Sequence, residues 1–232
     1  MGTLYVVGTP IGNLEDLTPR AARILSEVGL VAAEDTRRTR GLLSHLGLHK
    51  PLVSLHADVE RSRAPKVLEA LDHGDVAYCT DGGMPVISDP GAALVATARE
   101  AGFAVVVVPG PSAVTAALAA SGFAGDRFVF LGFLPRKASE MTRTFDALDA
   151  ERRTVVAFES PLRLVKALDI ISAVLPTRRV AVARELTKVH EEVRVGTAAE
   201  LSRHYQEHPP KGEITLLVEG VSKAEMRQRN QS

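Results

Sequence analysis

One loop of this sequence concentrates the side chains and the backbone freedom that a binding site needs. It runs from Thr80 to Gly91, consists mostly of Asp, Gly, Pro, Ser and Thr, and follows the short apolar run Val76–Cys79. A plain connection between a strand and a helix takes only about 2 to 6 residues, so the extra length favours a binding loop. Small residues allow a ligand to approach the backbone, and the carboxylates of Asp81 and Asp89 are suited to bind hydroxyl groups or a cation.

Two further loops rich in glycine and proline also follow apolar runs. Gly8–Leu14 comes after Leu4–Val7, and Pro109–Ser112 comes after Val105–Val108. The first loop does not have the form G-x-G-x-x-G, so neither a dinucleotide-binding fold nor the commonest methyltransferase fold is supported. Three such loops at the same edge of a sheet predict a cleft for a small polar ligand.

Two clusters of charged residues, Glu34–Arg40 and Arg184–Lys188, come directly after apolar runs as well. One interpretation is the ordinary start of an exposed helix, in which acidic side chains balance the helix dipole and arginines point into solvent. The other interpretation is functional, because the carboxyl ends of strands are where ligands bind in this kind of sheet. Both clusters are therefore candidates to face the predicted cleft.

The elements that must position these loops are strands that alternate with helices. Five runs in the first half are short, apolar and bounded by turn formers, which predicts strands at Leu4–Val7, Leu30–Ala33, Leu52–Leu55, Val76–Cys79 and Val105–Val108. Apolar residues recur at helical spacing between them, for example after Thr18-Pro19, an N-cap followed by proline at the first helical position. This order predicts a mainly parallel sheet covered by helices.

The second half repeats the theme with predicted strands at Phe128–Leu131, Thr154–Phe158, Val180–Ala183, Glu192–Val195 and Ile214–Val218. The stretch from Ala183 to Val195 is too short for a crossover helix, so these neighbours cannot be parallel and the second sheet should be mixed. A stretch punctuated by Gly and Pro from Gly122 to Pro135 marks the predicted boundary. We therefore predict two α/β domains, residues 1–121 with the ligand loops and residues 122–232 with the mixed sheet.

Composition narrows the class of protein further. The chain has 232 residues, 45% of them hydrophobic and 24% charged, as in an ordinary globular protein. Its single cysteine, Cys79, excludes an internal disulfide, which favours a cytoplasmic protein. The histidine pairs His45/His49 and His204/His208 have zinc-pair spacing but no evident third ligand, so we predict no metal site. We also predict no membrane segment, since the longest aliphatic stretch ends at Pro109.

A set of six motifs resembles one known family over essentially the whole chain, from Leu4 to Gly220. The motifs are V-G-T-P-I-G-N-L, A-A-E-D-T-R, D-G-G-M-P-V-I-S-D-P-G, P-G-P-S-A, A-R-E-L-T-K and K-G-E-I-T-L-L-V-E-G. Their order and spacing resemble those of the tetrapyrrole methylase superfamily. Within it, A-E-D-T-R and A-R-E-L-T-K are similar to the branch that methylates the 2′-hydroxyl of a cytidine in 16S ribosomal RNA.

This resemblance implies a homodimer that binds S-adenosylmethionine in a cleft between its two domains. The implied cofactor-binding residues are Pro10, Asp81, Gly82, Gly83, Met84, Pro85, Ser88, Asp89 and Ser112. Many relatives have threonine at the position of Met84, so contact there would come from the backbone. A ribose hydroxyl is a weak nucleophile that benefits from a proton acceptor. Asp35 or Glu185 is expected in that role, because each carboxylate follows a strand and is flanked by cations.

The same resemblance makes 16S rRNA within the small ribosomal subunit the expected partner, with phosphates bound by Arg37, Arg38, Arg40 and Lys188. The chain has 28 Lys and Arg residues against 28 Asp and Glu residues, which gives no overall attraction to nucleic acid. However, residues 36–66 contain seven cations and two anions, so positive charge is concentrated near the predicted cleft. Two alternatives stay open: a porphyrinoid C-methyltransferase with the same fold, and a ribosome-assembly factor that binds RNA without catalysis.

Overall fold

The computed structural model describes residues 1–222, which form two compact units, and the last part of the domain predicted over 122–232 lies outside the described residues. The first unit ends at Ser112 and the second begins at Ala113, nine residues before the predicted boundary. The reason is helix α5 (Ala113–Ser121), which packs against strands of the second sheet. Its buried residues Val114, Ala117 and Leu118 therefore belong to the second unit.

The first unit contains a five-stranded sheet in which every pairing is parallel, as predicted. Its order is β3-β2-β4-β1-β5. The strands are β1 (Thr3–Val7), β2 (Leu30–Ala33), β3 (Leu52–Ser54), β4 (Val76–Cys79) and β5 (Ala104–Val108). Because all five run in the same direction, the loops that follow them meet at one edge of the sheet.

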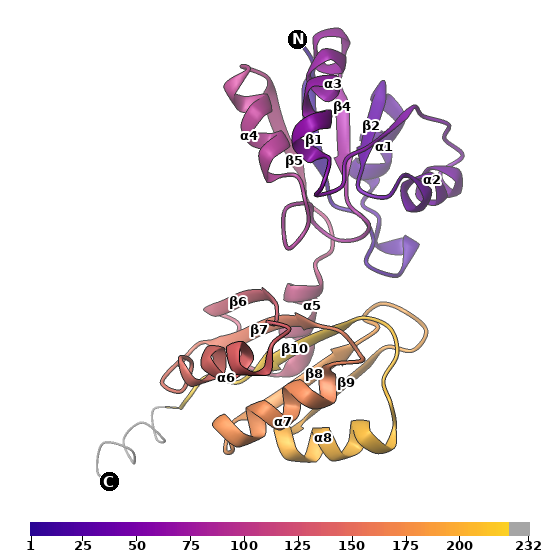
Figure 1. The fold of residues 1–232 in the computed structure, drawn as a ribbon. Coiled ribbons are helices and arrows are strands. Elements are labelled where there is room, and N and C mark those ends of the chain that lie inside the picture. Colours follow the sequence, from indigo (N-terminus) through magenta and orange to yellow (C-terminus); the bar gives the residue numbers. More distant parts are fainter. Residues whose placement is uncertain (223–232) are drawn as a thin grey trace. The chain divides into compact units, whose positions relative to one another are not determined.

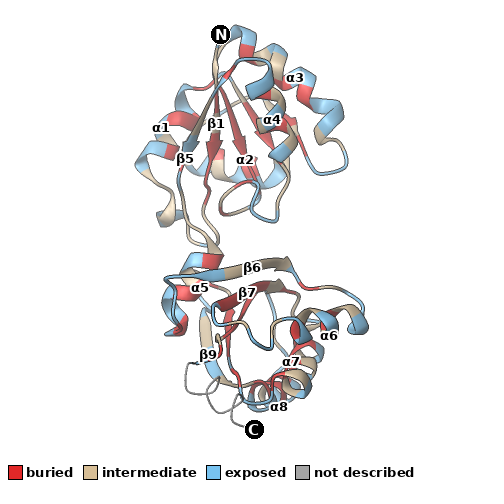
Figure 2. Cartoon of the chain, turned by 90° about the vertical axis from the view of Figure 1, so that its left-hand side faces the viewer, coloured by how far each residue is buried: buried red, intermediate tan, exposed pale blue. Residues whose placement is uncertain are grey.

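Helices cover both faces of this sheet, with a short 3-10 helix η1 (Leu14–Asp16) after β1. The helices are α1 (Pro19–Glu27), α2 (Thr36–His45), α3 (Glu60–His73) and α4 (Ala92–Glu100). Buried residues of α1 and α2 share one core with Ala77 and Cys79, while those of α3 and α4 share another with Tyr78. Figure 2 shows the inner strands of the sheet mostly in red and the outer faces of the helices in pale blue, whereas the edge strand β5 is largely exposed or intermediate.

Side chains accept hydrogen bonds at the starts of α1 and α4 in ways that the sequence explains in part. The predicted cap is present at α1, where the hydroxyl of Thr18 accepts a hydrogen bond from the backbone amide of Ala21 at 3.1 Å. Helix α4 begins after Gly91, which has no side chain to cap it. A carboxylate oxygen of Glu60, at the start of α3, instead accepts from the backbone amide of Leu94 at 2.9 Å. Helix α4 is thus fixed to α3 at the end nearest the ligand loops.

The second unit has a mixed sheet in the order β6-β7-β10-β8-β9, in which only β6 and β7 are parallel (Figure 1). Its strands are β6 (Phe128–Phe133), β7 (Thr154–Glu159), β8 (Arg179–Arg184), β9 (Glu192–Thr197) and β10 (Ile214–Val218). Strands β8 and β9, which a short connection joins, form an antiparallel pair, and this confirms the predicted mixed sheet.

Helices α6 (Ala138–Asp146), α7 (Leu164–Val174) and α8 (Ala198–Glu207) contribute to the main core of this unit. Residues of β7, β8 and β10 alternate between that core and the face that packs against α5. Within residues 1–222 no helix is long and apolar enough to cross a membrane.

Candidate functional site

Three loops of the first unit converge at the carboxyl edge of its sheet. Thr9 and Gly83 exchange two backbone hydrogen bonds of 2.9 Å each, so the loop after β1 is paired with the loop after β4. Gly8 packs directly on Gly110 of the loop after β5, because a Cβ atom on Gly8 would lie 2.7 Å from the Cα of Gly110. The sulfur of Met84 accepts a hydrogen bond from the amide of Gly110 at 3.3 Å, which joins the loop after β5 to the loop after β4.

These contacts explain why the loops contain so much glycine. A Cβ atom on Gly82 would lie 3.1 Å from the carbonyl oxygen of Pro10, and Gly83 has a φ of +84°, a conformation that L residues rarely adopt. The predicted cofactor residues from Pro10 to Met84 are thus brought together by backbone contacts. Met84 contributes its thioether to this loop packing.

The tip of the loop after β4 is strained. Val86 has a φ of 76° and Ser88 a φ of 65°, and β-branched valine is particularly disfavoured in this region. The loop closes on itself through a 3.3 Å hydrogen bond from the amide of Val86 to the carbonyl of Pro90. Pro85 is buried, whereas Val86 and Ser88 are exposed. Backbone conformations that are rarely populated, such as those of Val86 and Ser88, are typical of segments that the surrounding structure holds ready for contact with a ligand.

Three carboxylates form a network between the ends of the adjacent strands β2 and β4. The backbone amide of Asp81 donates to Oε2 of Glu34 at 3.3 Å, and the backbone amide of Asp35 donates to Oδ1 of Asp81 at 3.2 Å. The other oxygen of Asp81 lies 3.4 Å from Nε of Arg38. The carboxylates of Glu34 and Asp81 are therefore each held by a main-chain amide of the other loop, which fixes the edge of the site.

Asp35 is engaged with the start of α2. Its side chain caps this helix by accepting from the amide of Arg37 at 2.8 Å, and it pairs with the guanidinium of Arg37, whose Nη2 lies 2.6 Å from Oδ2. The Arg37 hydrogen bonds lower the pKa of Asp35 to about 2. The carboxylate is thus a weak base whose main structural partners are the helix and one arginine. Arg40 is exposed further along α2.

Glu34 is not among the site residues predicted from the sequence, although it is adjacent to Asp35. Burial raises the pKa of Glu34, and the nearby carboxylates of Asp89 and Asp81 raise it further, against the opposing effect of the Asp81 amide. Burial also raises the pKa of Asp89, whereas the side chain of Thr80 opposes that rise. A carboxylate with a raised pKa is a better proton acceptor than one in an ion pair.

A pocket of about 130 Å³ opens between the loop after β1 and helix α2. It is lined by three buried threonines and by one cation and one anion, together with apolar residues: Thr9, Pro10, Leu14, Arg38, Thr39, Leu42, Thr80 and Asp81. Hydroxyl, guanidinium and carboxylate groups around so small a space suit a polar ligand that carries hydroxyl groups.

Glu185 and Lys188 belong to the second unit, where they pair with each other. Oε1 of Glu185 accepts from Nζ of Lys188 at 2.8 Å and from the amide of Glu213 at 3.0 Å. The contact with Lys188 lowers the pKa of Glu185. The carboxyl group lies over Gly212, where a Cβ atom would come within 2.1 Å of Oε1. Glu185 itself has a φ of 52°, so this pair is built into a strained turn after β8.

The converged loops suit a small ligand that combines a cation with hydroxyl groups. Glu34, Asp81 and Asp89 provide negative charge, and backbone groups are accessible wherever glycine replaces a larger side chain. Ser112 directly precedes α5 at the end of the loop after β5. Among residues 1–222 no group of three or more His, Cys, Asp and Glu side chains is arranged to hold a metal ion.

Comparisons with known proteins agree with this architecture. The family model described as Tetrapyrrole (Corrin/Porphyrin) Methylases matches residues 3–202. The protein named Ribosomal RNA small subunit methyltransferase I from Thermotoga maritima is 47% identical over 221 residues, which is 95% of this chain and 99% of that protein. The protein of the same name from Escherichia coli O157:H7 is 46% identical over 94% of this chain and 78% of its own length.

Solved structures show the same fold at lower identity. A crystal structure of diphthine synthase has a TM-score of 0.72 and 15% sequence identity, and the match covers 94% of this chain and 90% of that chain. The resemblance predicted from the six motifs is thus confirmed. The acidic, glycine-rich edge also fits a cofactor with a sulfonium cation and ribose hydroxyls, since carboxylates attract the cation and bind the hydroxyls. This chain belongs to the tetrapyrrole methylase family of S-adenosylmethionine-dependent methyltransferases.

Proposed function

We propose that this protein transfers a methyl group from S-adenosylmethionine to the 2′-hydroxyl of a cytidine in 16S rRNA of the small ribosomal subunit. The observation that carries the proposal is the start of α2, where Arg37 and Arg38 are held on Asp35 and Asp81 beside the converged loops. Guanidinium groups fixed in this way suit the phosphates of a nucleic acid. The names of the relatives supply the kind of RNA.

The cofactor provides the methyl group, which it carries on a positively charged sulfur. The residues proposed to hold it are those of the three converged loops: Pro10, the segment 81–85, Ser88, Asp89 and Ser112. Carboxylates attract the positively charged sulfur of the cofactor, and the backbone of the glycine residues allows the cofactor to approach closely. Orientation of the two reactants supplies much of the rate in such a displacement.

The acceptor hydroxyl must lose a proton, and three carboxylates are candidates to receive it. The sequence favours Asp35 or Glu185. Glu34 is the better acceptor, because burial raises its pKa while the ion pairs of Asp35 and Glu185 lower theirs. In this proposal Glu34 receives the proton, and Asp35 and Glu185 hold Arg37 and Lys188 in place for phosphate contacts.

Transfer of tritium from labelled S-adenosylmethionine tests the function directly. Purified small ribosomal subunits, naked 16S rRNA and a porphyrinoid are offered side by side to the full chain. Label in the RNA of the subunits, located by nuclease digestion at a cytidine ribose, supports the proposal. Label in the porphyrinoid alone would instead assign a C-methyltransferase.

Calorimetry with S-adenosylmethionine tests the remaining alternative. Binding of the cofactor is expected, and its absence together with intact RNA binding would assign a non-catalytic assembly factor. We further propose that the protein acts as a homodimer in the cytoplasm, where small subunits mature. Light scattering at several protein concentrations checks the dimer, and a constant monomer mass would contradict it.

A further inference from the structure

Strand β6, at the edge of the second sheet, ends in an exposed aromatic ring. Phe133 is 61% exposed, whereas the next residue, Leu134, is 2% exposed. Figure 2 shows β6 largely in tan and blue beside the red strand β7. Single exposed apolar residues are common on protein surfaces, but Phe133 is the most exposed of the phenylalanine and tyrosine side chains in residues 1–222.

A bulge in β6 keeps this ring out of the core. Val129 and Leu131 pack against the helix-covered core, and strict alternation would place Phe133 on that same face. However, Phe130 pairs with Val156 and Phe133 pairs with Phe158, so three steps on β6 match two on β7. The extra residue is accommodated at Gly132, which has a φ of +67°. The bulge therefore turns Phe133 onto the opposite face.

The position of the ring is fixed by its neighbours. Phe133 meets Phe158 edge to face, with ring centroids 5.5 Å apart at an angle of 60°, and Phe130 meets the same ring at 5.0 Å. The chain beyond Phe133 is held by Arg163, which donates to the carbonyl of Leu134 at 3.2 Å and forms an ion pair with the buried Glu159. One side of the ring is thus supported by protein while the remainder is open.

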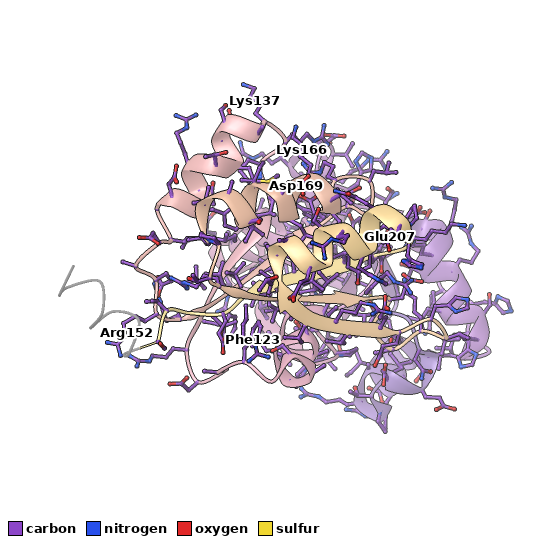
Figure 3. The ribbon with its side chains drawn as sticks, turned by 90° about the horizontal axis from the view of Figure 1, so that it is seen from below. Phe123, Lys137, Arg152, Lys166, Asp169 and Glu207 are labelled. Atoms are coloured by element: carbon purple, nitrogen blue, oxygen red, sulfur yellow. The ribbon has the colours of Figure 1, made fainter. Side chains whose placement is uncertain are left out.

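Two cations, Arg136 and Lys137, follow Phe133 three and four residues further along the chain. Arg136 and Lys137 are both exposed, and Figure 3 shows Lys137 projecting outward at the start of α6. The contact of Lys137 with Glu140, at 3.3 Å on the surface, leaves its side chain 77% exposed. An open aromatic face followed in the chain by exposed cations resembles the way proteins bind unpaired nucleotides, with a base stacked on the ring and phosphates near the charges.

We infer that Phe133 is a stacking platform for an unpaired base of the RNA, with Arg136 and Lys137 on its phosphates. This inference rests on the proposed function for the identity of the RNA. A duplex would not satisfy the ring, because its bases are already stacked on one another. A second copy of the chain could also cover an apolar ring, but it would not account for the two exposed cations that follow the ring in the chain.

Fluorescence offers a direct test, because the chain contains no tryptophan. Phe133→Trp introduces a single indole, which stacks on bases at least as well as phenylalanine does. The probe is a single-stranded RNA oligonucleotide of mixed sequence, with the same sequence as a duplex for comparison. We expect the single strand to quench the indole and the duplex to leave it nearly unchanged. Equal quenching by both, or none by either, would overturn the inference.

Affinity measurements separate stacking from general apolar contact. Phe133→Ala and Phe133→Leu are each expected to weaken binding of the single strand by about 5- to 100-fold. Phe133→Trp should retain it, and Phe128→Ala is the matched control from the same strand, where Phe128 is 38% exposed. Wild-type affinity in Phe133→Leu would contradict stacking. A shift of Phe133→Ala to a smaller oligomer with unchanged RNA affinity would assign the ring to a contact between copies.

Failure of this inference is distinguishable from failure of the proposed function. If the wild-type protein methylates rRNA and the Phe133 variants bind the oligonucleotide normally, only the inference fails. If the wild-type protein binds the oligonucleotide through Phe133 but transfers no methyl group to RNA, the proposed function fails and the stacking platform stands.

Discussion

The backbone amide of Asp81 donates a hydrogen bond to Oε2 of Glu34 across 3.3 Å, and this contact joins residues 47 positions apart in the chain. The amide of Glu34 in turn donates to the carbonyl of Cys79 at 3.2 Å, one residue beyond the last pair of β2 and β4. Main-chain groups therefore hold both the backbone amide and the carboxylate of Glu34. The hydrogen bonds that hold Glu34 do not use the side chain of Asp81, although the charge of that side chain helps to raise the pKa of Glu34.

Replacement of Glu34 by glutamine should remove the proton acceptor while an amide oxygen still accepts from Asp81. General bases contribute about 10²- to 10⁴-fold, so we expect Glu34→Gln to lower kcat at least about 100-fold. The wild-type rate should fall as the pH drops through the raised pKa of Glu34, because the protonated carboxyl cannot accept a proton. The pH profile of kcat should lose this acidic limb in the variant.

The matched control is Asp35→Asn, which keeps a residue that can cap α2. Since the pKa of Asp35 is about 2, its carboxylate stays ionised at every pH at which the enzyme is assayed. Asp35→Asn should therefore leave the acidic limb where it is. A larger loss of kcat in Asp35→Asn or Glu185→Gln than in Glu34→Gln would identify Asp35 or Glu185, the residues that the sequence favours, as the proton acceptor.

The same Glu34→Gln variant should be more stable than the wild type at neutral pH. Because the pKa of Glu34 is raised above its ordinary value of 4.5, the folded protein holds a partly buried charge at a cost. Protonation relieves that cost, so the difference in Tm should shrink as the pH falls through the raised pKa and vanish near pH 4. Thermal unfolding at several pH values measures this, and a variant less stable than wild type at pH 8 would argue against burial as the cause.

Much of the fold follows from local sequence signals. The limits of β2, β4 and β10 agree with the apolar runs because turn-forming residues flank those runs closely. Helix α6 was not predicted, since its few apolar residues follow a loop and give a weak pattern. The sequence predicts the domain boundary after α5, since an apolar helix can pack on either neighbouring sheet. The contacts in the structure assign α5 to the second sheet.

The sequence predicts which loops meet at one edge of the sheet, but it does not predict which carboxylates there are buried. Glu34 and Asp35 are adjacent acids after the same strand, so their types and spacing cannot tell which one is buried. The difference arises because α2 begins at Thr36, which makes Asp35 the cap and leaves Glu34 on the strand side. Likewise the F-V-F-L-G-F run of β6 predicts simple alternation, and the bulge at Gly132 depends on register with β7.

Contact between Gly8 and Gly110 predicts a sharp effect of a single methyl group. Gly8→Ala would place a Cβ atom 2.7 Å from the Cα and N atoms of Gly110 and from the sulfur of Met84. Such overpacking costs about 1 to 3 kcal/mol and should push the three loops apart. We expect lower stability in urea unfolding and weaker binding of S-adenosylmethionine by calorimetry.

Gly41→Ala is the control for this change, because a Cβ atom at Gly41 meets nothing within 4 Å and the residue lies inside α2. Alanine in a helix should stabilise the protein by about 0.5 to 1 kcal/mol and leave cofactor binding unchanged. If Gly8→Ala has wild-type stability and cofactor affinity, close contact between these loops is not needed for folding or for binding of the cofactor.

Salt dependence tests whether the arginines of α2 bind the RNA. Each phosphate contact to single-stranded nucleic acid contributes about 0.7 to the slope of log K against log salt concentration. Replacement of Arg37, Arg38 and Arg40 by alanine should therefore flatten that slope by about 2 for binding to small ribosomal subunits. Binding should weaken most at low salt, where release of counterions from the RNA contributes most.

The matched control removes three other cations from the same basic stretch, Arg61, Arg63 and Lys66, which α3 carries. Both triple variants lose three positive charges, so they differ only in where the charge lies. If α2 contacts the phosphates, only the first variant changes the slope markedly. Equal flattening in both would indicate diffuse attraction to the whole stretch, and no change in the first would place the RNA elsewhere, with the ring of Phe133 as the next surface to examine.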